Sequence, residues 1–142
     1  HAGGAVERMV LDAAENDIVI VEGQGSLLHP GSTATLPLSR GSCPTHMILC
    51  HRAQMTHLDT TSKNSENPVE VPPIKDVIAL NEAVAHAAGA LFKSKVVGIC
   101  LNTRELDEHS ARAEIKKLEF EVGLPVEDPV RFGVAKISNT LL

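Results

Sequence analysis

The sequence predicts an α/β fold with a mostly parallel sheet and flanking helices. Three short apolar runs carry no charged residue: IVIV at 18–21, MILC at 47–50 and VVGICLN at 96–102. Such runs are typical of strands that are buried on both faces, as in parallel sheets. Segments with helical periodicity lie before the first run and between the second and third, and this alternation of strands and helices implies parallel strands joined by right-handed crossovers. We expect all 142 residues to form one domain.

The first half of the chain has one predicted helix and two predicted strands, separated by long loops. Apolar residues recur at helical spacing over 4–15, which predicts an amphipathic helix leading into the strand at 18–21. Residues 23–45 are rich in glycine and proline, so we expect a long loop with room for a short helical turn. After the strand at 47–50, a second long loop covers 52–73. Loops of this length are usually functional or disordered.

The second half of the chain carries clearer helix signals. Helical spacing resumes at Ile74, and the predicted apolar face is formed by Val77, Leu80, Val84, Ala87 and Leu91. The strand at 96–102 follows. Asp107 is a plausible N-cap for the next helix, which Gly123 should end.

The C-terminal part is predicted to hold one short strand and one weak helix. The strand lies at 125–128, where Asp128-Pro129 has the form of an N-cap followed by a first-turn proline. We expect the helix over 134–142.

Composition and charge exclude several classes of function. The net charge is -5 with no basic stripe, which argues against nucleic acid as a partner. No apolar run is long enough to cross a membrane, and no signal-peptide pattern opens the sequence. The three cysteines lack CxxC spacing and are expected to be reduced thiols, which favours a cytoplasmic protein: Cys43, Cys50 and Cys100.

The strongest candidate site follows the run at 18–21. In open α/β sheets, ligands bind beyond the carboxyl ends of the strands, and Glu22 lies there. Its carboxylate is a candidate catalytic group and Mg²⁺ ligand. Gly23 and Gly25 would let the backbone approach a ligand, while Gln24 and Ser26 add an amide and a hydroxyl. The alternative is an ordinary tight turn after a strand.

Further candidates lie at the ends of the other predicted strands and in the first loop. Asn102 can pair with the edge of a purine, although it can also simply begin a turn. His51 and Arg52 face the expected ligand, and a guanidinium suits a phosphate or carboxylate; alternatively, Arg52 is a solvated surface residue. His29 can act as a general base or be a hydrogen-bonded loop residue. No G-x-x-x-x-G-K-[ST] or G-x-G-x-x-G motif is present in these residues.

Four segments together resemble a known family: EGQGSLLHP at 22–30, ILCHR at 48–52, VVGICLNTREL at 96–106 and GLPVEDPVRFG at 123–133. They resemble the C-terminal domain of a bacterial and archaeal family of unknown function, loosely labelled NAD-dependent epimerase/dehydratase. Its members look like two-domain proteins, with a Rossmann-like domain followed by a P-loop domain of the dethiobiotin-synthetase type. Some are described as D-glutamate N-acetyltransferases.

This resemblance implies a P-loop NTPase-like fold and a role in acyl transfer. Glu22 matches the magnesium-binding acid of dethiobiotin synthetase, and Asn102 matches its base-recognising asparagine. The implied ligands are Mg²⁺ with ATP, or acetyl-CoA. The implied reaction transfers an acyl group to an amino acid, or forms an amide on it, with D-glutamate N-acetylation as one form. The alternatives are a non-catalytic domain that binds a ligand or oligomerises and, less favoured, an NAD-dependent epimerase.

In the family, the P-loop and its lysine precede the segment that resembles residues 3–7. We therefore expect this chain to be an incomplete P-loop-like domain, inactive alone but part of an enzyme in the full-length protein. An incomplete parallel sheet exposes unpaired backbone at an edge. The expectation is a homo-oligomer that associates through that edge, or a rearrangement within 23–73.

Overall fold

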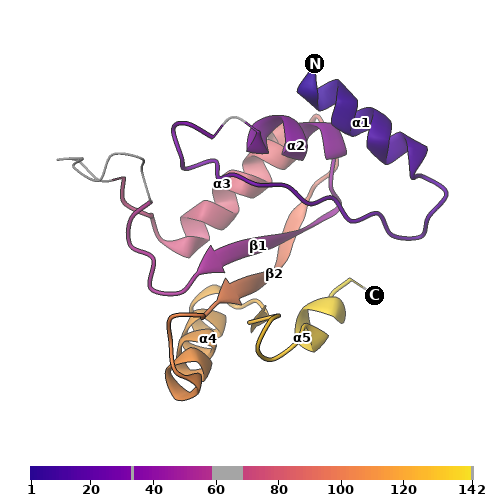
Figure 1. Cartoon of the computed structure of the whole chain (residues 1–142). Coiled ribbons are helices and arrows are strands. Elements are labelled where there is room, and N and C mark those ends of the chain that lie inside the picture. The colour runs from indigo at the N-terminus through magenta and orange to yellow at the C-terminus, as the bar shows by residue number, and fades with distance from the viewer. Residues whose placement is uncertain (33, 59–68, 142) are drawn as a thin grey trace.

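The computed structural model describes residues 1–32, 34–58 and 69–141. Figure 1 shows a sheet with helices on both sides of it and a helical pair above it. The elements, in chain order, are α1 (Ala2–Asp12), α2 (Thr35–Ser42), β1 (His46–Arg52), α3 (Ile74–His86), the 3₁₀ turn η1 (Ala87–Gly89), β2 (Lys95–Asn102), α4 (Glu108–Val122), β3 (Val126–Glu127) and α5 (Ala135–Ser138).

The sheet is parallel, as predicted, and its strand order is β1-β2-β3. In the register of the first two strands, Cys50 lies opposite Cys100 and Arg52 lies opposite Asn102. The carboxyl ends of β1 and β2 are therefore level with each other. Side chains that follow these two strands must emerge at one edge of the sheet.

The hydrophobic core lies between one face of the sheet and the helices α3 and α4. Ile99 and Leu101 of β2 point into it, because alternate residues of a strand share a face. The helices contribute Ile74 from α3 and Ile115 and Leu118 from α4.

Of the apolar face predicted for α3, Val77 is buried, Val84 is half-buried and Leu80 is exposed. The helix ends at His86, so Ala87 and Leu91 of the predicted face lie beyond it.

Helix α4 begins and ends where the sequence indicates. The Asp107 side chain accepts a hydrogen bond from the Ser110 backbone N–H at 3.0 Å, which is the geometry of an N-cap. Gly123 ends the helix in the left-handed conformation, with φ of 72°.

The opposite face of the sheet is covered in part by α5. A Cβ at Gly98 would lie 3.1 Å from a side-chain atom of Ile137, so a side chain there would force Ile137 to shift by a few tenths of an ångström. Glu127 of β3 accepts hydrogen bonds from the backbone N–H groups of Lys136 and Ile137, at 3.0 and 3.2 Å. The last strand therefore fixes the start of the last helix.

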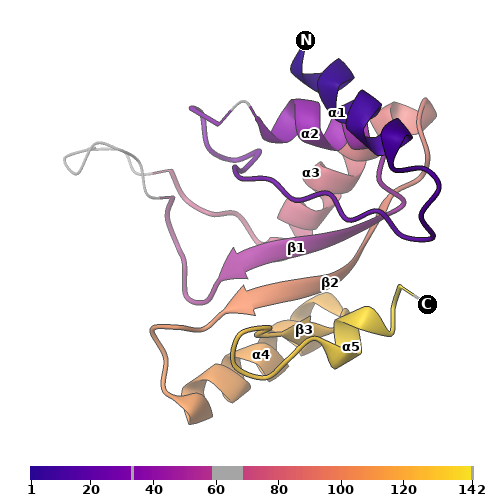
Figure 2. The same ribbon diagram turned by 45° about the vertical axis from the view of Figure 1, so that its right-hand side comes forward.

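The predicted buried strand at 18–21 is wrong. These residues have no regular secondary structure, and Ile18 and Ile20 are 58% and 86% exposed. Figures 1 and 2 show the segment running alongside β1, yet no backbone hydrogen bond between the two is found in the described residues. A run of β-branched residues forms a strand only if a neighbouring strand pairs with it.

Three other boundaries differ from those predicted. The first helix ends at Asp12 and buries none of its residues, and the last helix covers only Ala135–Ser138. Asp128-Pro129 caps a single turn and not a helix, because Phe132 N–H donates to the Asp128 carbonyl and the chain then leaves the turn. The long loop over 23–45 contains α2, while residues 59–68 of the second loop lie outside the described residues.

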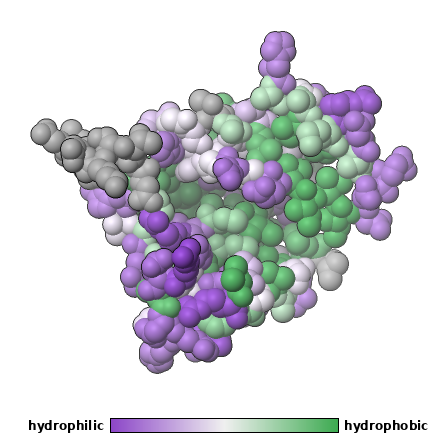
Figure 3. All heavy atoms as spheres, in the orientation of Figure 1, coloured by the Kyte–Doolittle hydropathy of each residue, from purple (hydrophilic) through white to green (hydrophobic). Residues whose placement is uncertain are grey.

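The exposed apolar surface is concentrated beside β1. In Figure 3, hydrophobic residues gather over the middle of the face where Figure 1 places β1 and the chain that follows α1. Ile18, Val19, Ile20, Val21 and Ile48 are all exposed. Within the described residues, no helix is both long enough and apolar enough to cross a membrane.

Candidate functional site

A recess of about 160 Å³ lies at the carboxyl ends of β1 and β2. Arg52 and Ala53 form one side of it, and Asn102 with the following loop forms the other. It thus lies at the edge where ligands bind in open α/β sheets. Ligand pockets for whole small molecules are usually larger, at roughly 300–1,000 Å³. This recess is matched in size to one part of a ligand, such as a base or a phosphate.

Arg52 and Asn102 are brought together by the strand register, in which they are direct partners. The Ala53 N–H donates to the Asn102 carbonyl at 3.0 Å, which extends the pairing by one residue. The Asn102 side chain begins a turn, because its Oδ1 accepts from the Arg104 N–H at 3.0 Å. Of the two expected roles of Asn102, the turn is therefore realised, while the residue also lines the recess.

The loop after β2 forms the wall of the recess with four residues: Thr103, Arg104, Glu105 and Leu106. The side chains of Arg104 and Glu105 are 86% and 83% exposed, and their ion pair is long, at 3.8 Å. An exposed pair at this distance contributes little to stability. Both side chains therefore remain available for a ligand in the recess.

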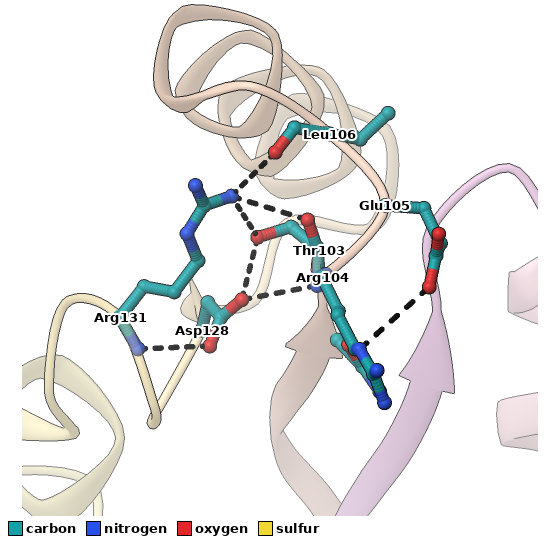
Figure 4. A network of polar contacts seen from close by, with 7 residues as sticks. Thr103, Arg104, Glu105, Leu106, Asp128 and Arg131 are labelled. Carbon is teal, nitrogen blue, oxygen red and sulfur yellow. Dashed lines mark hydrogen bonds and ion pairs between the residues drawn. The ribbon is translucent and has the colours of Figure 1, made fainter.

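A polar network lies behind this loop, in which Thr103 and Asp128 are buried and Arg131 is exposed (Figure 4). Asp128 accepts hydrogen bonds from the Thr103 N–H at 3.0 Å and from the Thr103 hydroxyl at 2.5 Å. Burial acts to raise the pKa of Asp128, but the hydrogen bonds from Thr103, Val130 and Arg131 lower the pKa below its usual range. The side chain of Arg131, from the same segment as Asp128, donates to the Thr103 carbonyl at 3.1 Å.

His51 and Arg52 lie on opposite faces of the sheet, because neighbouring side chains of a strand alternate. His51 lines a second recess of about 150 Å³, together with residues of α4 and the chain after β1. Burial, and then the charge of Arg52, lower the pKa of His51. A neutral imidazole is consequently favoured there. The two residues thus face different spaces.

The Glu22–Ser26 turn has a defined geometry. Gly25 has a positive φ of 121°, and a Cβ there would overlap the hydroxyls of Ser32 and Thr35. A Cβ on Gly23 would overlap Leu38 of α2. Ser26 N–H donates to the Ser32 hydroxyl at 3.1 Å. Gly25 is therefore required by its backbone conformation and close packing, whereas a side chain at Gly23 would displace a terminal methyl group of Leu38.

The candidates on this loop are not part of the recess at Arg52 and Asn102. Neither Glu22 nor His29 lines it, and Gln24 also lies elsewhere. The Nδ1 atom of His29 accepts from the Gly31 N–H at 3.1 Å, so this histidine takes the role of a hydrogen-bonded loop residue. The structure brings together two of the predicted site residues and leaves the others apart.

Sequence reasoning missed the residues of the polar network. Asp128 was interpreted as a helix N-cap, and Thr103 and Arg131 carried no recognised pattern. One carboxylate oxygen of Asp128 does cap the local turn, at the N–H groups of Val130 and Arg131, and the other accepts from Thr103, 25 positions earlier in the chain. The sequence does contain one signal for this network, because Asp128 ends a predicted strand and Pro129 follows it. A carboxylate at the end of a strand needs hydrogen-bond donors when it is buried.

The candidate site residues suit some of the expected ligands better than others. Arg52 and Arg104 have guanidinium groups that can bind phosphates. For a metal, no group of three His, Cys, Asp or Glu residues gathers within the described part of the chain. Because Mg²⁺ in nucleotide sites is held by one or two carboxylates with phosphates and water, Glu22 could supply one ligand only.

Comparisons with known proteins agree on one family. Residues 1–138 match the family model "Domain of unknown function (DUF1611_C) P-loop domain". The chain is 33% identical, over 139 residues, to a D-glutamate N-acetyltransferase from Tritonibacter scottomollicae, covering 97% of the chain and 40% of that protein. A D-glutamate N-acetyltransferase from a Pseudoalteromonas species is 35% identical over 139 residues, with the same coverage of 97% and 40%.

One solved structure is also similar. It is the crystal structure of a DUF1611 family protein from Anabaena variabilis ATCC 29413 at 2.30 Å resolution, with a TM-score of 0.88 and 51% sequence identity. The match covers 98% of this chain and 39% of that chain. The chain thus spans about 40% of the length of these curated relatives.

Proposed function

Because the chain belongs to the DUF1611 family, through its C-terminal P-loop domain, we propose that it is part of an enzyme that binds acetyl-CoA or ATP and transfers an acyl group to an amino acid. Two relatives named D-glutamate N-acetyltransferase support acetyl-CoA as donor and D-glutamate as acceptor. The part played by these residues would be ligand binding at the carboxyl edge of the sheet.

The observation that carries this proposal is the recess between Arg52 and Asn102. ATP and CoA both contain adenine, ribose and phosphates, and the recess combines an amide with two guanidinium groups. The amide of Asn102 would pair with adenine through its Nδ2 donor, since Oδ1 already accepts from Arg104 N–H. Arg52 and Arg104 would bind phosphates. The recess accommodates one such part of the ligand, and the remainder would extend beyond it.

In the proposed reaction, the amino nitrogen of the acceptor attacks the thioester carbonyl of acetyl-CoA. The nitrogen loses a proton to a base, and the CoA thiolate leaves. Glu22 and His29 are the candidate bases of this chain, and both lie outside the recess. If ATP is the ligand instead, Mg²⁺ would neutralise charge on its phosphates, with Glu22 as one ligand.

The proposal is tested by steady-state kinetics on the full-length protein, with acetyl-CoA or ATP and a panel of D- and L-amino acids. Asn102→Asp keeps the oxygen that accepts from Arg104 but removes the amide donor, so we expect the KM for the adenine-bearing ligand to rise about tenfold. Glu22→Gln should lower kcat. The matched control is Arg8→Gln, which removes only an exposed ion pair with Asp12 on α1.

Two results would contradict the proposal. One is that the full-length protein binds neither acetyl-CoA nor ATP. The other is that Glu22→Gln and Asn102→Asp both behave like the Arg8→Gln control. Either result would favour the alternative of a non-catalytic domain.

A further inference from the structure

We propose that Asp128 and Arg131 are positioning residues, which hold the loop 103–106 in the shape that binds the ligand. The inference rests on the proposed function, because the loop is the wall of the recess at Arg52 and Asn102. Neither residue lines that recess. They form hydrogen bonds with Thr103 and Leu106, two residues of the loop that forms its wall (Figure 4).

Asp128 is the centre of this arrangement. It is 2% exposed, and each carboxylate oxygen accepts two hydrogen bonds. Oδ2 binds the N–H and hydroxyl of Thr103, and Oδ1 binds the N–H groups of Val130 and Arg131. A buried carboxylate loses its contact with water, and hydrogen bonds of this number are needed to offset that loss. One side chain thereby links the loop after β3 to the first residue of the loop after β2.

Arg131 donates hydrogen bonds to both ends of the same loop. Its Nη1 atom donates to the carbonyl of Thr103 at 3.1 Å and to the carbonyl of Leu106 at 2.9 Å. Leu106 N–H also donates to the Thr103 carbonyl at 2.9 Å, which closes the turn. The two ends of the loop are thus held, while the residues between them, Arg104 and Glu105, keep exposed side chains.

The network also connects the loop to Asn102. Arg104 N–H donates to the Asn102 side chain, so a shift of the loop would move the turn that orients the amide. The guanidinium of Arg104 would be displaced at the same time. Misplacement of a binding group by about 1 Å can cost as much as 100-fold in rate. We therefore expect the network to control ligand affinity as well as stability.

The test compares two arginines that contact the same ring. Both guanidinium groups lie over Phe132, at 5.7 Å for Arg131 and 4.1 Å for Arg112. Only Arg131 is bonded to the loop, since Arg112 pairs with Glu108 of its own helix. Arg131→Met and Arg112→Met, each made in the full-length protein, therefore differ chiefly in the loss of the loop contacts.

A second pair of variants isolates the link to Asp128. Thr103→Val keeps the shape of the side chain and removes the hydroxyl that donates to Asp128, whereas Thr103→Ser keeps the hydroxyl. Binding of acetyl-CoA and of ATP is measured by calorimetry for all four variants and the wild type. Thermal unfolding of the same samples reports stability, and hydrogen exchange reports the amides of 104–105.

We expect Arg131→Met and Thr103→Val to weaken binding about tenfold and to speed exchange at 104–105, with Arg112→Met and Thr103→Ser within about twofold of wild type. Unchanged affinity of folded Arg131→Met, with only a lower Tm, would overturn the inference and leave the proposed function intact. If the wild type binds neither acetyl-CoA nor ATP, the proposed function fails and the inference fails with it.

Discussion

At the scale of single residues, the buried carboxylate of Asp128 shows most clearly how chemistry and fold are linked. Its side chain satisfies four donors from two separate loops. Replacing the charge would leave those donors with a weaker acceptor. Hydrogen bonds to charged groups contribute more than neutral ones.

Asp128→Asn is expected to lower the free energy of unfolding at pH 7 by about 1–3 kcal/mol. The pKa of Asp128 is lowered in the folded protein, so its contribution is present above the unfolded pKa of about 3.9 and is lost as the pH falls through the lower, folded value. Urea unfolding of wild type and variant at pH 7 and below pH 4 should show the difference shrinking toward low pH. Asp12→Asn, at an exposed ion pair on α1, is the control and should change the free energy of unfolding little at pH 7.

The roles of single residues could be predicted only where they are local. The N-cap at Asp107 and the stop at Gly123 depend on residues within one turn, and both are confirmed. The partner of Asp128 is 25 residues away in the sequence. Nothing in the pattern around Asp128 identifies that partner, because a tertiary contact decides it.

At the scale of elements, the packing of α5 on β2 depends on the absence of a side chain at Gly98. A Cβ there would lie 3.1 and 3.2 Å from the γ-carbons of Ile137, closer than ordinary contact. Ile137 is itself 2% exposed. The helix is short, so its position is decided by this contact and by Glu127 at its start.

Gly98→Ala is expected to destabilise the protein by about 1–3 kcal/mol through overpacking. Ile137→Ala alone should cost about 2–5 kcal/mol. The double variant should cost less than the sum, because the alanine at 98 partly fills the space left by Ile137. Chemical denaturation of the three variants measures this coupling, and strict additivity would show that the two residues do not pack as described.

The elements themselves could be predicted where burial comes from partners within the chain. VVGICLN at 96–102 forms β2 because β1 and β3 pair with it on its two sides. IVIV at 18–21 is richer in β-branched residues, with four in four against three in seven, and yet forms no strand. The difference lies in the neighbouring strands. A run of β-branched residues allows a segment to form a strand, and pairing with another strand decides whether the strand forms.

At the scale of the whole molecule, the side of the sheet next to β1 is the least protected surface. β1 pairs with β2 on one side only, and the apolar segment 18–21 beside it is exposed. Exposed strand edges and apolar patches favour association. The homo-oligomer therefore stays a prediction, and the apolar surface beside β1 is where we expect its subunits to associate.

Ile20→Lys is expected to reduce self-association of the 142-residue chain, because it places a charge in the apolar surface beside β1. Phe120→Lys is the matched control, since Phe120 is 93% exposed on α4, away from that surface. Light scattering over a concentration series measures the average mass. A wild-type chain that is monomeric at all concentrations, or an equal effect of both variants, would contradict association at this surface.

The central claim, that the recess at Arg52 and Asn102 binds the adenine and phosphate part of a ligand, has one direct test. Hydrogen exchange of the full-length protein is followed with and without acetyl-CoA, and with and without ATP. We expect at least one of these ligands to protect the amides of residues 52–53 and 102–106. Binding that protects other segments and leaves these amides unchanged would contradict it.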